Sequence, residues 1–413
     1  MRVAIVGAGI SGVTLALRLQ QLGVDTTLLC DRTPAEQRAG RVENLVARFP
    51  ATRDRERRLS VAHWDDLGSC ASQGIDVDVI GTSLGFLGCF ERPAQGIDFR
   101  VYVARLVEDY VARGGQLVVG PLPANPTELV AQTAAHDVIV VAAGRSSGLA
   151  PALFAVRRDR SPYTRPQRRL LGGLYEGVAA TDPPAVCFNL VPGAGEIFQQ
   201  PFLTDRGVFA AMLVEAVPDG PLEPITRIDV AAHPRRFAHA LLGVLEAFAP
   251  KLAARVDAAH FGPLGPRDVL QGAITPTVRA GWTTLPDGRL ALAVGDAWIV
   301  NDPITGQGAN IGSYCAWRMA DELHAAERVD AAFACELEDE LWSYAGPVTA
   351  WTNAWLQPPP EHILDVLGAA TAHQPVADAF ARGFADPVRF AADLATPEAA
   401  ATFTRDNLAL AGV

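Results

Sequence analysis

The chain has 413 residues, of which 49% are hydrophobic and 20% are charged, and it carries a formal net charge of −11 at pH 7. This length accommodates two closely joined domains with a substantial core, and the composition is ordinary for a soluble enzyme. The negative charge argues against binding to nucleic acid or to an anionic membrane surface, and no run of about eighteen apolar residues predicts a transmembrane span.

The N-terminal segment has the pattern of one βαβ unit. Residues 2–6 are predicted to form a buried parallel strand, residues 10–22 a helix, and residues 25–30 a second strand. Since the first strand begins at once and glycine follows at Gly7, this segment is predicted to be folded structure and not a signal peptide.

The rest of the chain alternates between strand and helix patterns. Residues 32–60, which are polar and rich in arginine, predict no regular element. From about residue 165 to 290 alternating patterns predict a sheet platform that faces a pocket, and the tail from about residue 330 is predicted to be mostly helical with a break at residues 358–360. The other expected elements are helices over residues 99–113, 235–250 and 308–325 and strands over residues 116–119, 137–144, 170–175, 186–190, 208–213 and 290–294.

Three glycines at GxGxxG spacing, Gly7, Gly9 and Gly12, join the first strand to the first helix. They allow a tight turn, close approach of the backbone to a pyrophosphate, and close packing of helix on strand, so that the N–H groups of the helix can bind phosphate. Asp31 lies about twenty residues beyond Gly12, where an acidic side chain accepts hydrogen bonds from ribose, and Arg32 follows it. The strand, the helix, the spacing and the acid together predict a dinucleotide site.

A second glycine motif favours FAD over NAD. Residues 290–294 are predicted to be a strand that delivers Gly295–Asp296, and this aspartate is typical of those that bind the ribityl chain of a flavin. Asp302–Pro303 would then place a rigid ring beside the isoalloxazine, and a helix begins within Gly306–Asn310. Because reduced flavin gathers negative charge at its N1–C2=O edge, the N-terminus of that helix would stabilise it.

Together with residues 142–145, these motifs resemble those of the flavoprotein monooxygenases of the p-hydroxybenzoate hydroxylase fold. The chain resembles more closely the epoxidase component of the two-component styrene and indole monooxygenases. That likeness extends over almost the whole chain and is specific as a set, which comprises residues 31–36, 41–46, 98–102, 270–272, Pro276 with Arg279, 302–310 and 351–353.

The resemblance implies an α/β fold in which a Rossmann-like FAD-binding domain is interleaved with a β-sheet substrate domain and followed by a helical C-terminal region. The implied ranges are 1–165 and 265–330 for a discontinuous FAD-binding domain, 70–100 and 166–264 for the substrate-binding domain, and 331–413 for the helical region. The boundaries are not expected to be sharp, because the flavin site draws on residues from both ends of the first domain.

The resemblance also implies a chemistry. Enzymes of this kind receive reduced FAD from a separate NADH-dependent flavin reductase, and the flavin reacts with O2 to give a C4a-(hydro)peroxyflavin. This species transfers one oxygen atom to an aromatic alkene, an indole or a thioether, while the protein positions the reactants and excludes water. The implied partners are a small hydrophobic aromatic substrate, O2 and a transient reductase in the cytoplasm, with a homodimer left open.

Carried over by position, Arg41 and Asn44 belong to the loop that faces the flavin, with Asn44 near the hydroperoxide or the substrate. Pro303 completes the predicted catalytic set, and Arg100 is expected to support the FAD or the loop. No metal ligand is predicted, because neither the cysteines nor the histidines have ligand spacing. The predicted cofactor-binding residues are Gly7, Gly9, Ser11, Gly12, Asp31, Arg32, Arg41, Arg100, Gly144, Gly295, Asp296, Pro303, Gly306, Gly308, Ala309 and Asn310.

The chain also departs from the family pattern. Residues 72–95 lack an expected aromatic and histidine-rich stretch, and Arg48 stands where the styrene enzymes have histidine. Trp298 and Asn301 are unusual as well. All these positions are expected near the substrate wall, so a natural-product substrate or an N- or S-oxygenation stays open.

Other clusters have two interpretations each. Trp342, Trp351 and Trp355 lie at helical spacing, which indicates either core packing or a substrate wall. Residues 53–58 indicate a solvated helix face or, alternatively, a docking surface for a reductase.

Alternative functions stay open at this stage. A single-component NAD(P)H-dependent aromatic hydroxylase commonly has Asp-Gly where this chain has Ala143–Gly144, so these residues favour the two-component enzyme. A halogenase would need a WxWxIP motif, which is absent, and a tunnel lysine, whereas the only lysine is Lys251. A flavin-binding module without oxygenase activity would not need the cradle at residues 302–310.

Overall fold

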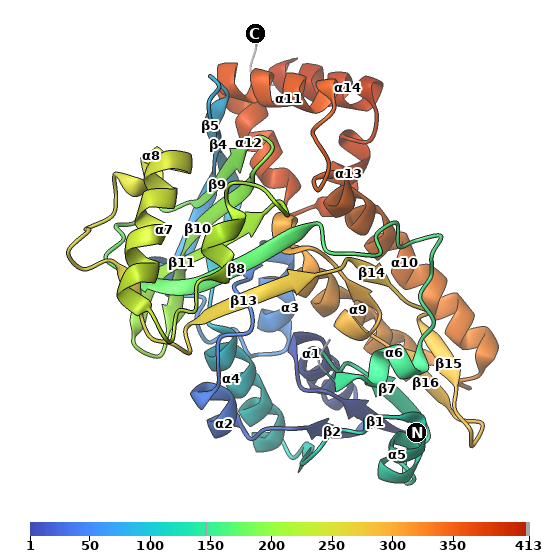
Figure 1. Ribbon diagram of the computed structural model, residues 1–413. Coiled ribbons are helices and arrows are strands. Elements are labelled where there is room, and N and C mark those ends of the chain that lie inside the picture. Colours follow the sequence, from blue (N-terminus) through green and yellow to red (C-terminus); the bar gives the residue numbers. More distant parts are fainter. Residues whose placement is uncertain (145–146, 410–413) are drawn as a thin grey trace.

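The computed structural model describes residues 1–144 and 147–409, which form two large sheets and a helical C-terminal region (Figure 1). The helices are α1 (Ile10–Gln21), α2 (Pro34–Ala39), α3 (Pro50–Arg58), α4 (Phe99–Ala112), α5 (Pro126–Gln132), α6 (Leu149–Leu153), α7 (Pro234–Phe248), α8 (Pro250–Ala253), α9 (Gly308–Ala325), α10 (Ala331–Ala354), α11 (Glu361–Ala372), α12 (Gln374–Gly383), α13 (Pro387–Asp393) and α14 (Pro397–Ala409). The strands are β1 (Arg2–Val6), β2 (Asp25–Cys30), β3 (Ala47–Arg48), β4 (Ala71–Val79), β5 (Gly85–Gly96), β6 (Gln116–Val119), β7 (Val138–Val141), β8 (Arg168–Glu176), β9 (Val186–Val191), β10 (Gly195–Thr204), β11 (Gly207–Ala216), β12 (Gly262–Pro263), β13 (Val269–Ile274), β14 (Thr277–Val278), β15 (Trp282–Thr284), β16 (Leu290–Ala293) and β17 (Ile299–Val300).

The smaller of the two large sheets lies in the lower half of Figure 1 and contains the predicted βαβ unit. Its strand order is β15-β16-β7-β1-β2-β6, and β1 pairs in parallel with both β2 and β7. The central strands β7 and β16 are buried at every position, as expected for parallel strands whose two faces are covered. The predicted strands at residues 2–6, 25–30, 116–119 and 290–294 and the helix at 10–22 are confirmed to within a residue.

The nine-stranded sheet forms the predicted platform. Its order is β12-β8-β11-β10-β9-β4-β5-β3, with β13 also paired to β8, and among these neighbours only β4 and β9 run in parallel. On one side, α7 packs Phe237, Leu241 and Leu245 into a core cluster with Tyr175 of β8. The strands β3 and β13 come from ranges that the resemblance gives to the FAD-binding domain, so the sheet draws on both parts of the chain.

The C-terminal region is helical from α10 to α14, and its break at residues 358–360 is confirmed between α10 and α11. The helix α12 packs against β5, which attaches this region to the large sheet (Figure 1). The ring of Trp351 lies 5.2 Å from that of Phe384 and 5.4 Å from that of Phe390, which favours core packing for this tryptophan. No helix in the described part of the chain is long and apolar enough to cross a membrane.

The prediction that residues 32–60 hold no regular element is wrong, because α2, β3 and α3 all lie there. The helix α2 begins with a capping box between Thr33 and Glu36 and with Pro34 in its first turn, features that stabilise a short helix start. The solvated face predicted for residues 53–58 is also only partly present, since Arg53 and Glu56 of α3 are buried. Their charges are paired inside the protein, which removes the apolar periodicity that reveals a buried helix face in sequence.

Candidate active site

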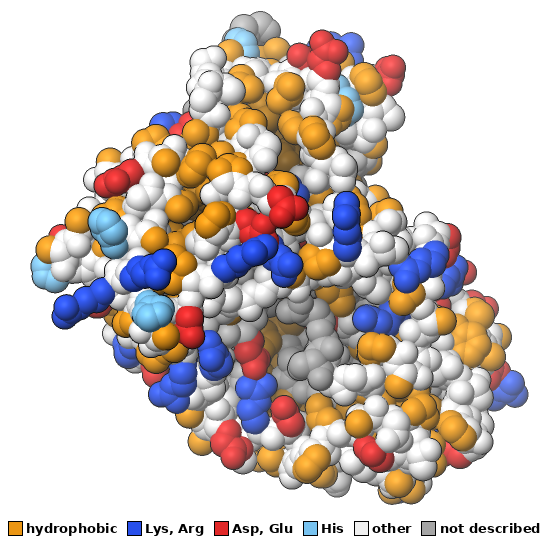
Figure 2. All heavy atoms as spheres, in the orientation of Figure 1, with side chains coloured by type: hydrophobic (Ala, Val, Ile, Leu, Met, Phe, Trp, Pro, Cys, Tyr) orange, Lys and Arg blue, Asp and Glu red, His pale blue; other side chains and the backbone are white. Residues whose placement is uncertain are grey.

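A cavity of about 880 Å³ lies between the two sheets, where the ends of β1 and β7 meet the faces of β8, β10 and β11. Figure 2 shows the corresponding side of the molecule hollowed between its upper and lower parts, with basic and acidic side chains along the rim. The predicted site residues that line the cavity are Gly7, Gly9, Ser11, Asp31, Arg32, Asn44, Gly144, Gly295, Asp296, Pro303, Gly306, Gly308 and Ala309. Segments far apart in sequence therefore form one site.

The first glycine turn has the close contacts that its spacing predicts. Gly7 has a φ of +108°, and a Cβ on Gly12 would lie 1.9 Å from the carbonyl oxygen of Gly7. A Cβ on Gly9 would meet nothing within 4 Å, since this residue faces the open cavity. Gly9 also precedes the first turn of α1. Since no side chain caps this helix, the N–H groups of its first turn are available to an anion.

The end of β2 supplies the polar residues expected at the ribose. Asp31 is exposed to the cavity and lies 3.5 Å from the Arg32 guanidinium. Arg32 in turn pairs with Glu43 at 2.7 Å, which connects β2 to the loop before β3. Because this ion pair balances the positive charge of Arg32, the residue offers hydrogen-bond donors to the cavity and little net charge.

The second glycine turn packs directly on the first helix. Gly295 has a φ of +63°, and a Cβ there would lie 2.5 Å from Oγ of Ser11. The next residue, Asp296, is exposed to the cavity, and Arg279 donates a hydrogen bond to its backbone oxygen at 3.1 Å. Close packing of the two turns explains why this position holds glycine and brings Asp296 beside the first motif.

The turn from Asp302 to Gly306 leads into α9. Gly306 has a φ of +65°, and α9 begins at Gly308 without a side-chain cap. Asn310 does not line the cavity. It accepts hydrogen bonds from the Phe49 N–H at 3.1 Å and the Thr52 hydroxyl at 2.7 Å, and it donates to the oxygens of Ala47 and Gly306. Asn310 therefore fixes the loop before α3 to the start of α9.

Two arginines that were predicted to bind the cofactor do not line the cavity. Arg41 is exposed and donates to the backbone oxygen of Val269 at 3.4 Å. Arg100 is buried, where it pairs with Asp98 at 2.6 Å and with Asp268 at 2.7 Å. Arg100 also donates to the oxygen of Gly40, so it contacts the loop that carries Arg41 through the backbone of that loop. Arg145 lies outside the described residues.

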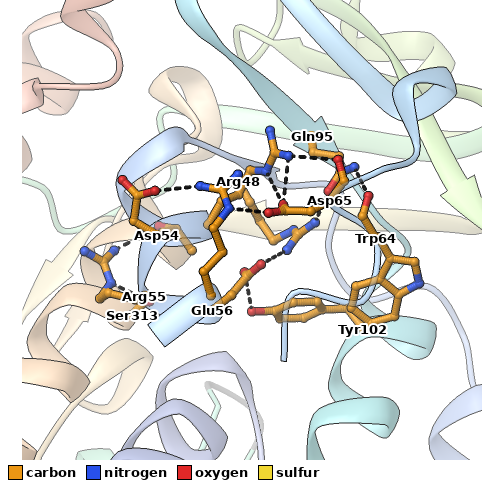
Figure 3. Close-up of polar contacts among 12 residues, drawn as sticks. Arg48, Asp54, Arg55, Glu56, Trp64, Asp65, Gln95, Tyr102 and Ser313 are labelled. Carbon is orange, nitrogen blue, oxygen red and sulfur yellow. Dashed lines mark hydrogen bonds and ion pairs between the residues drawn. The ribbon is translucent and has the colours of Figure 1, made fainter. Parts of the chain in front are cut away.

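Arg48 is buried in the polar cluster that Figure 3 draws and does not line the cavity, contrary to its expected place near the substrate wall. It pairs with Glu56 of α3, donates to Gln95 at 2.6 Å, and lies 4.8 Å from the ring centre of Tyr102. Tyr102 donates to Glu56 at 2.8 Å, and burial followed by the charge of Glu56 raises the pKa of Tyr102 well above its usual value.

Trp298, also expected near the substrate, does not line the cavity either. It is 1% exposed, and its ring packs 6.1 Å from that of Trp342. Asn301, in contrast, does line the cavity.

Sequence reasoning missed the apolar wall opposite the glycine turns. Phe188 and Phe198 stack with ring centres 4.5 Å apart, and Met212, Leu213 and Phe384 continue the surface. The first four residues belong to strands of the large sheet, whose alternating pattern predicted a platform but not which positions face the cavity. Phe384 follows α12, which no sequence pattern connects to the flavin motifs.

The residues of this cavity fit FAD on observations of their own. Two uncapped helix starts, α1 and α9, are suited to a pyrophosphate and to the anionic edge of a reduced flavin, and Gly9 leaves the space that a Cβ would fill. Asp31 and Asp296 supply acceptors for hydroxyl groups at the two turns. The fold and this site define an FAD-dependent oxidoreductase.

Comparison with known proteins identifies the family. Residues 2–84 match the FAD dependent oxidoreductase family, and residues 147–255 match the substrate binding domain family of styrene monooxygenase A. The chain is 32% identical over 405 residues to styrene monooxygenase StyA of Pseudomonas sp and equally to that of Pseudomonas fluorescens, with 96% of both chains covered in each case. The chain belongs to the styrene monooxygenase StyA family and is a flavin-dependent monooxygenase, which confirms the resemblance seen in its sequence.

Solved structures confirm the fold at lower identity. A flavoprotein/dehydrogenase from Cytophaga hutchinsonii superposes with a TM-score of 0.70 at 12% identity and 99% coverage of both chains. The flavin-dependent brominase Bmp2 superposes with a TM-score of 0.64 at 14% identity, over 98% of this chain and 93% of its own. At such identities the likeness concerns architecture and carries nothing about the reaction.

Proposed function

We propose that this chain is the epoxidase component of a two-component styrene monooxygenase, which takes reduced FAD from a separate NADH-dependent reductase and transfers one oxygen atom of O2 to an aromatic alkene. The observation that carries the proposal is the identity of 32% to StyA across 96% of both chains. The stacked Phe188 and Phe198 support it, because an apolar aromatic wall suits a styrene-like substrate. A cytoplasmic location is proposed because the reductase needs NADH.

The residues of the cavity suggest how the protein contributes. Bound in its reduced form, FAD supplies the reaction with O2. The apolar wall excludes water and holds the substrate, Asn44 and Pro303 border the space beside it, and the uncapped N-terminus of α9 stabilises negative charge.

The two-component assignment is tested by feeding the protein FAD that has been reduced anaerobically, in the absence of NAD(P)H, and then adding styrene and oxygenated buffer. Formation of styrene oxide in proportion to the reduced FAD is expected. Product that appears only when NADPH is added to the protein alone would indicate a single-component hydroxylase. If styrene gave no epoxide and a thioether or an amine added in its place were oxygenated, the protein would instead be an S- or N-oxygenase.

Replacing Asn44 with alanine is expected to leave FAD affinity nearly unchanged and to raise H2O2 release several-fold relative to epoxide. Asn44 lines the cavity, but its Oδ1 accepts a hydrogen bond from the Leu45 N–H at 2.7 Å, so it shapes the loop beside the substrate. Peroxide and epoxide are measured together, with Asn407→Ala on α14 as the control. Unchanged coupling in Asn44→Ala would remove this residue from the site.

Replacing Asp296 with alanine is expected to weaken FAD binding by about 1–3 kcal/mol, the cost of a lost hydrogen bond to the cofactor. The reason is its exposure to the cavity next to Gly295 and Ser11. FAD titration followed by flavin fluorescence measures the effect, and Asp205→Ala in the β10–β11 hairpin is the control. Equal affinity of both variants would contradict the assignment of this turn to FAD.

A further inference from the structure

Four charged side chains are buried together behind the turn that begins at Asp302. Glu215 of β11 is 0% exposed, Asp302 1%, Glu196 of β10 5% and Arg168 of β8 6%. Glu196 and Glu215 are direct partners in the β10–β11 register, a position in which two like charges repel each other. The carboxyl groups therefore need either counter-charges or a proton.

The charges do not balance if all four groups are ionised. Arg168 binds Glu196 through two hydrogen bonds, at 2.7 and 2.9 Å, so these two groups neutralise each other. Glu215 and Asp302 then remain as two buried negative charges, and within residues 1–144 and 147–409 no further cation pairs with either of them. A buried carboxylate without a partner is so costly that such a group takes up a proton instead.

The hydrogen bonds indicate which carboxyl group holds the proton. Oδ1 of Asp302 accepts from the Ile304 N–H at 3.3 Å, which favours the ionised form of Asp302. Among the described residues, no N–H group donates to either oxygen of Glu215 or to Oδ2 of Asp302. Burial first, and then the adjacent charge and hydrogen bond of Asp302, raise the pKa of Glu215 well above its usual value. A protonated Glu215 that donates to Oδ2 of Asp302 satisfies both groups.

We propose that Glu215 is a positioning residue whose proton, donated to Asp302, holds the turn from Asp302 to Gly306 against the cofactor. Within the turn, Asp302 accepts from the Ile304 N–H, Thr305 contacts the hydroxyl of Thr352 at 2.7 Å, and the oxygen of Gly306 accepts from Asn310. Since Asp302, Pro303 and Gly306 all line the cavity, a displacement of this turn changes the surface offered to FAD.

The proposal has a pH dependence with a definite sign. Below the raised pKa, Glu215 is neutral and the turn is held; above it, the proton leaves to solvent and two adjacent charges repel. Arg168 and Glu196, the other charged groups that face Glu215, line a second cavity of about 1420 Å³, which gives the proton a route to water. FAD affinity should stay level up to this pKa and fall by about tenfold per pH unit beyond it.

The test compares two replacements of Glu215 with a control on the surface of α9. In Glu215→Gln the amide can donate to Asp302 as the protonated acid does but cannot ionise, so affinity should match wild type at neutral pH and stay level under alkaline conditions. In Glu215→Leu the donor is lost and no second charge can form, so affinity should be weaker than that of wild type at neutral pH and should not fall further under alkaline conditions. The control, Glu322→Gln, removes a surface carboxylate but keeps Glu215, so its affinity should follow that of wild type at every pH.

Infrared difference spectra of the protein without FAD provide a second readout. At neutral pH, the spectrum of wild type minus that of Glu215→Gln should show the C=O stretch of a protonated carboxyl group. In wild type this band should disappear on alkaline titration, a measurement that needs no variant. Absence of the band, or the same alkaline fall of FAD affinity in wild type and Glu215→Gln, would overturn the proposal. The inference rests on the proposed placement of FAD, and the infrared band does not depend on it, so the two can fail separately.

Discussion

Replacing Gly12 with alanine is expected to abolish FAD binding and to destabilise the protein by about 3 kcal/mol or more, because an added Cβ would overlap backbone that cannot move aside. The new atom would lie 1.9 Å from the carbonyl oxygen of Gly7 and 3.2 Å from Cβ of Ala142. Relieving this overlap requires α1 to move away from β1 and β7. Urea unfolding measures the loss of stability, and flavin fluorescence measures the loss of FAD binding.

Gly9→Ala in the same turn is the matched control for that prediction. A Cβ on Gly9 meets no protein atom within 4 Å, so the variant should unfold at nearly the urea concentration of wild type. Its methyl group nevertheless enters the space where the pyrophosphate is expected, so FAD affinity should fall. If the two alanine variants behaved alike in both measurements, the separate roles of these glycines would be contradicted.

Replacing Arg100 with methionine is expected to cost about 3–5 kcal/mol of stability, the typical loss when one member of a buried ion pair is removed. Asp98 would lose its guanidinium partner, while Asp268 would keep the ion pair with Arg206 at 2.8 Å. Urea unfolding of wild type and of the variant at neutral pH measures this deficit.

Arg105→Met provides the control on the same helix. Arg105 is about half exposed and pairs with Asp109 at 3.3 Å, so its loss should cost about 0–1 kcal/mol. FAD affinity of folded Arg100→Met should change little, because Arg100 does not line the cavity. A loss of FAD affinity without a loss of stability would restore Arg100 to the cofactor site.

The two glycine motifs could be predicted from sequence because their requirements are local. Gly7, Gly9 and Gly12 act within one strand–turn–helix unit, so their spacing alone indicates the tight turn and the phosphate-binding helix start. The segment at residues 32–60 could not be predicted in this way. The helix α3 buries Arg53 and Glu56 through ion pairs with partners outside it, and hydrophobic periodicity does not detect a face of that kind.

Site residues divide along the same line. Asn44 lies on the cavity as expected, whereas Arg41 and Arg100 from the same family pattern do not line it. Arg41 reaches the backbone of β13, and Arg100 of α4 is held by its buried ion pairs. The alternating strand pattern did not reveal that Phe188 and Phe198 line the cavity. Which face of a strand borders the cavity depends on how the two sheets are joined, and the pattern does not contain that information.

The sequence by itself determined the FAD motifs, the strand–helix–strand unit that contains the first of them, and the family to which the chain belongs. Only the tertiary structure decided that Glu215 lies beside Asp302 and that Arg168 neutralises Glu196 and not either of these two. The physical reason is that a hydrogen-bonded turn depends on neighbours along the chain, whereas the ionisation of a buried carboxyl group depends on its burial and on charges from distant strands.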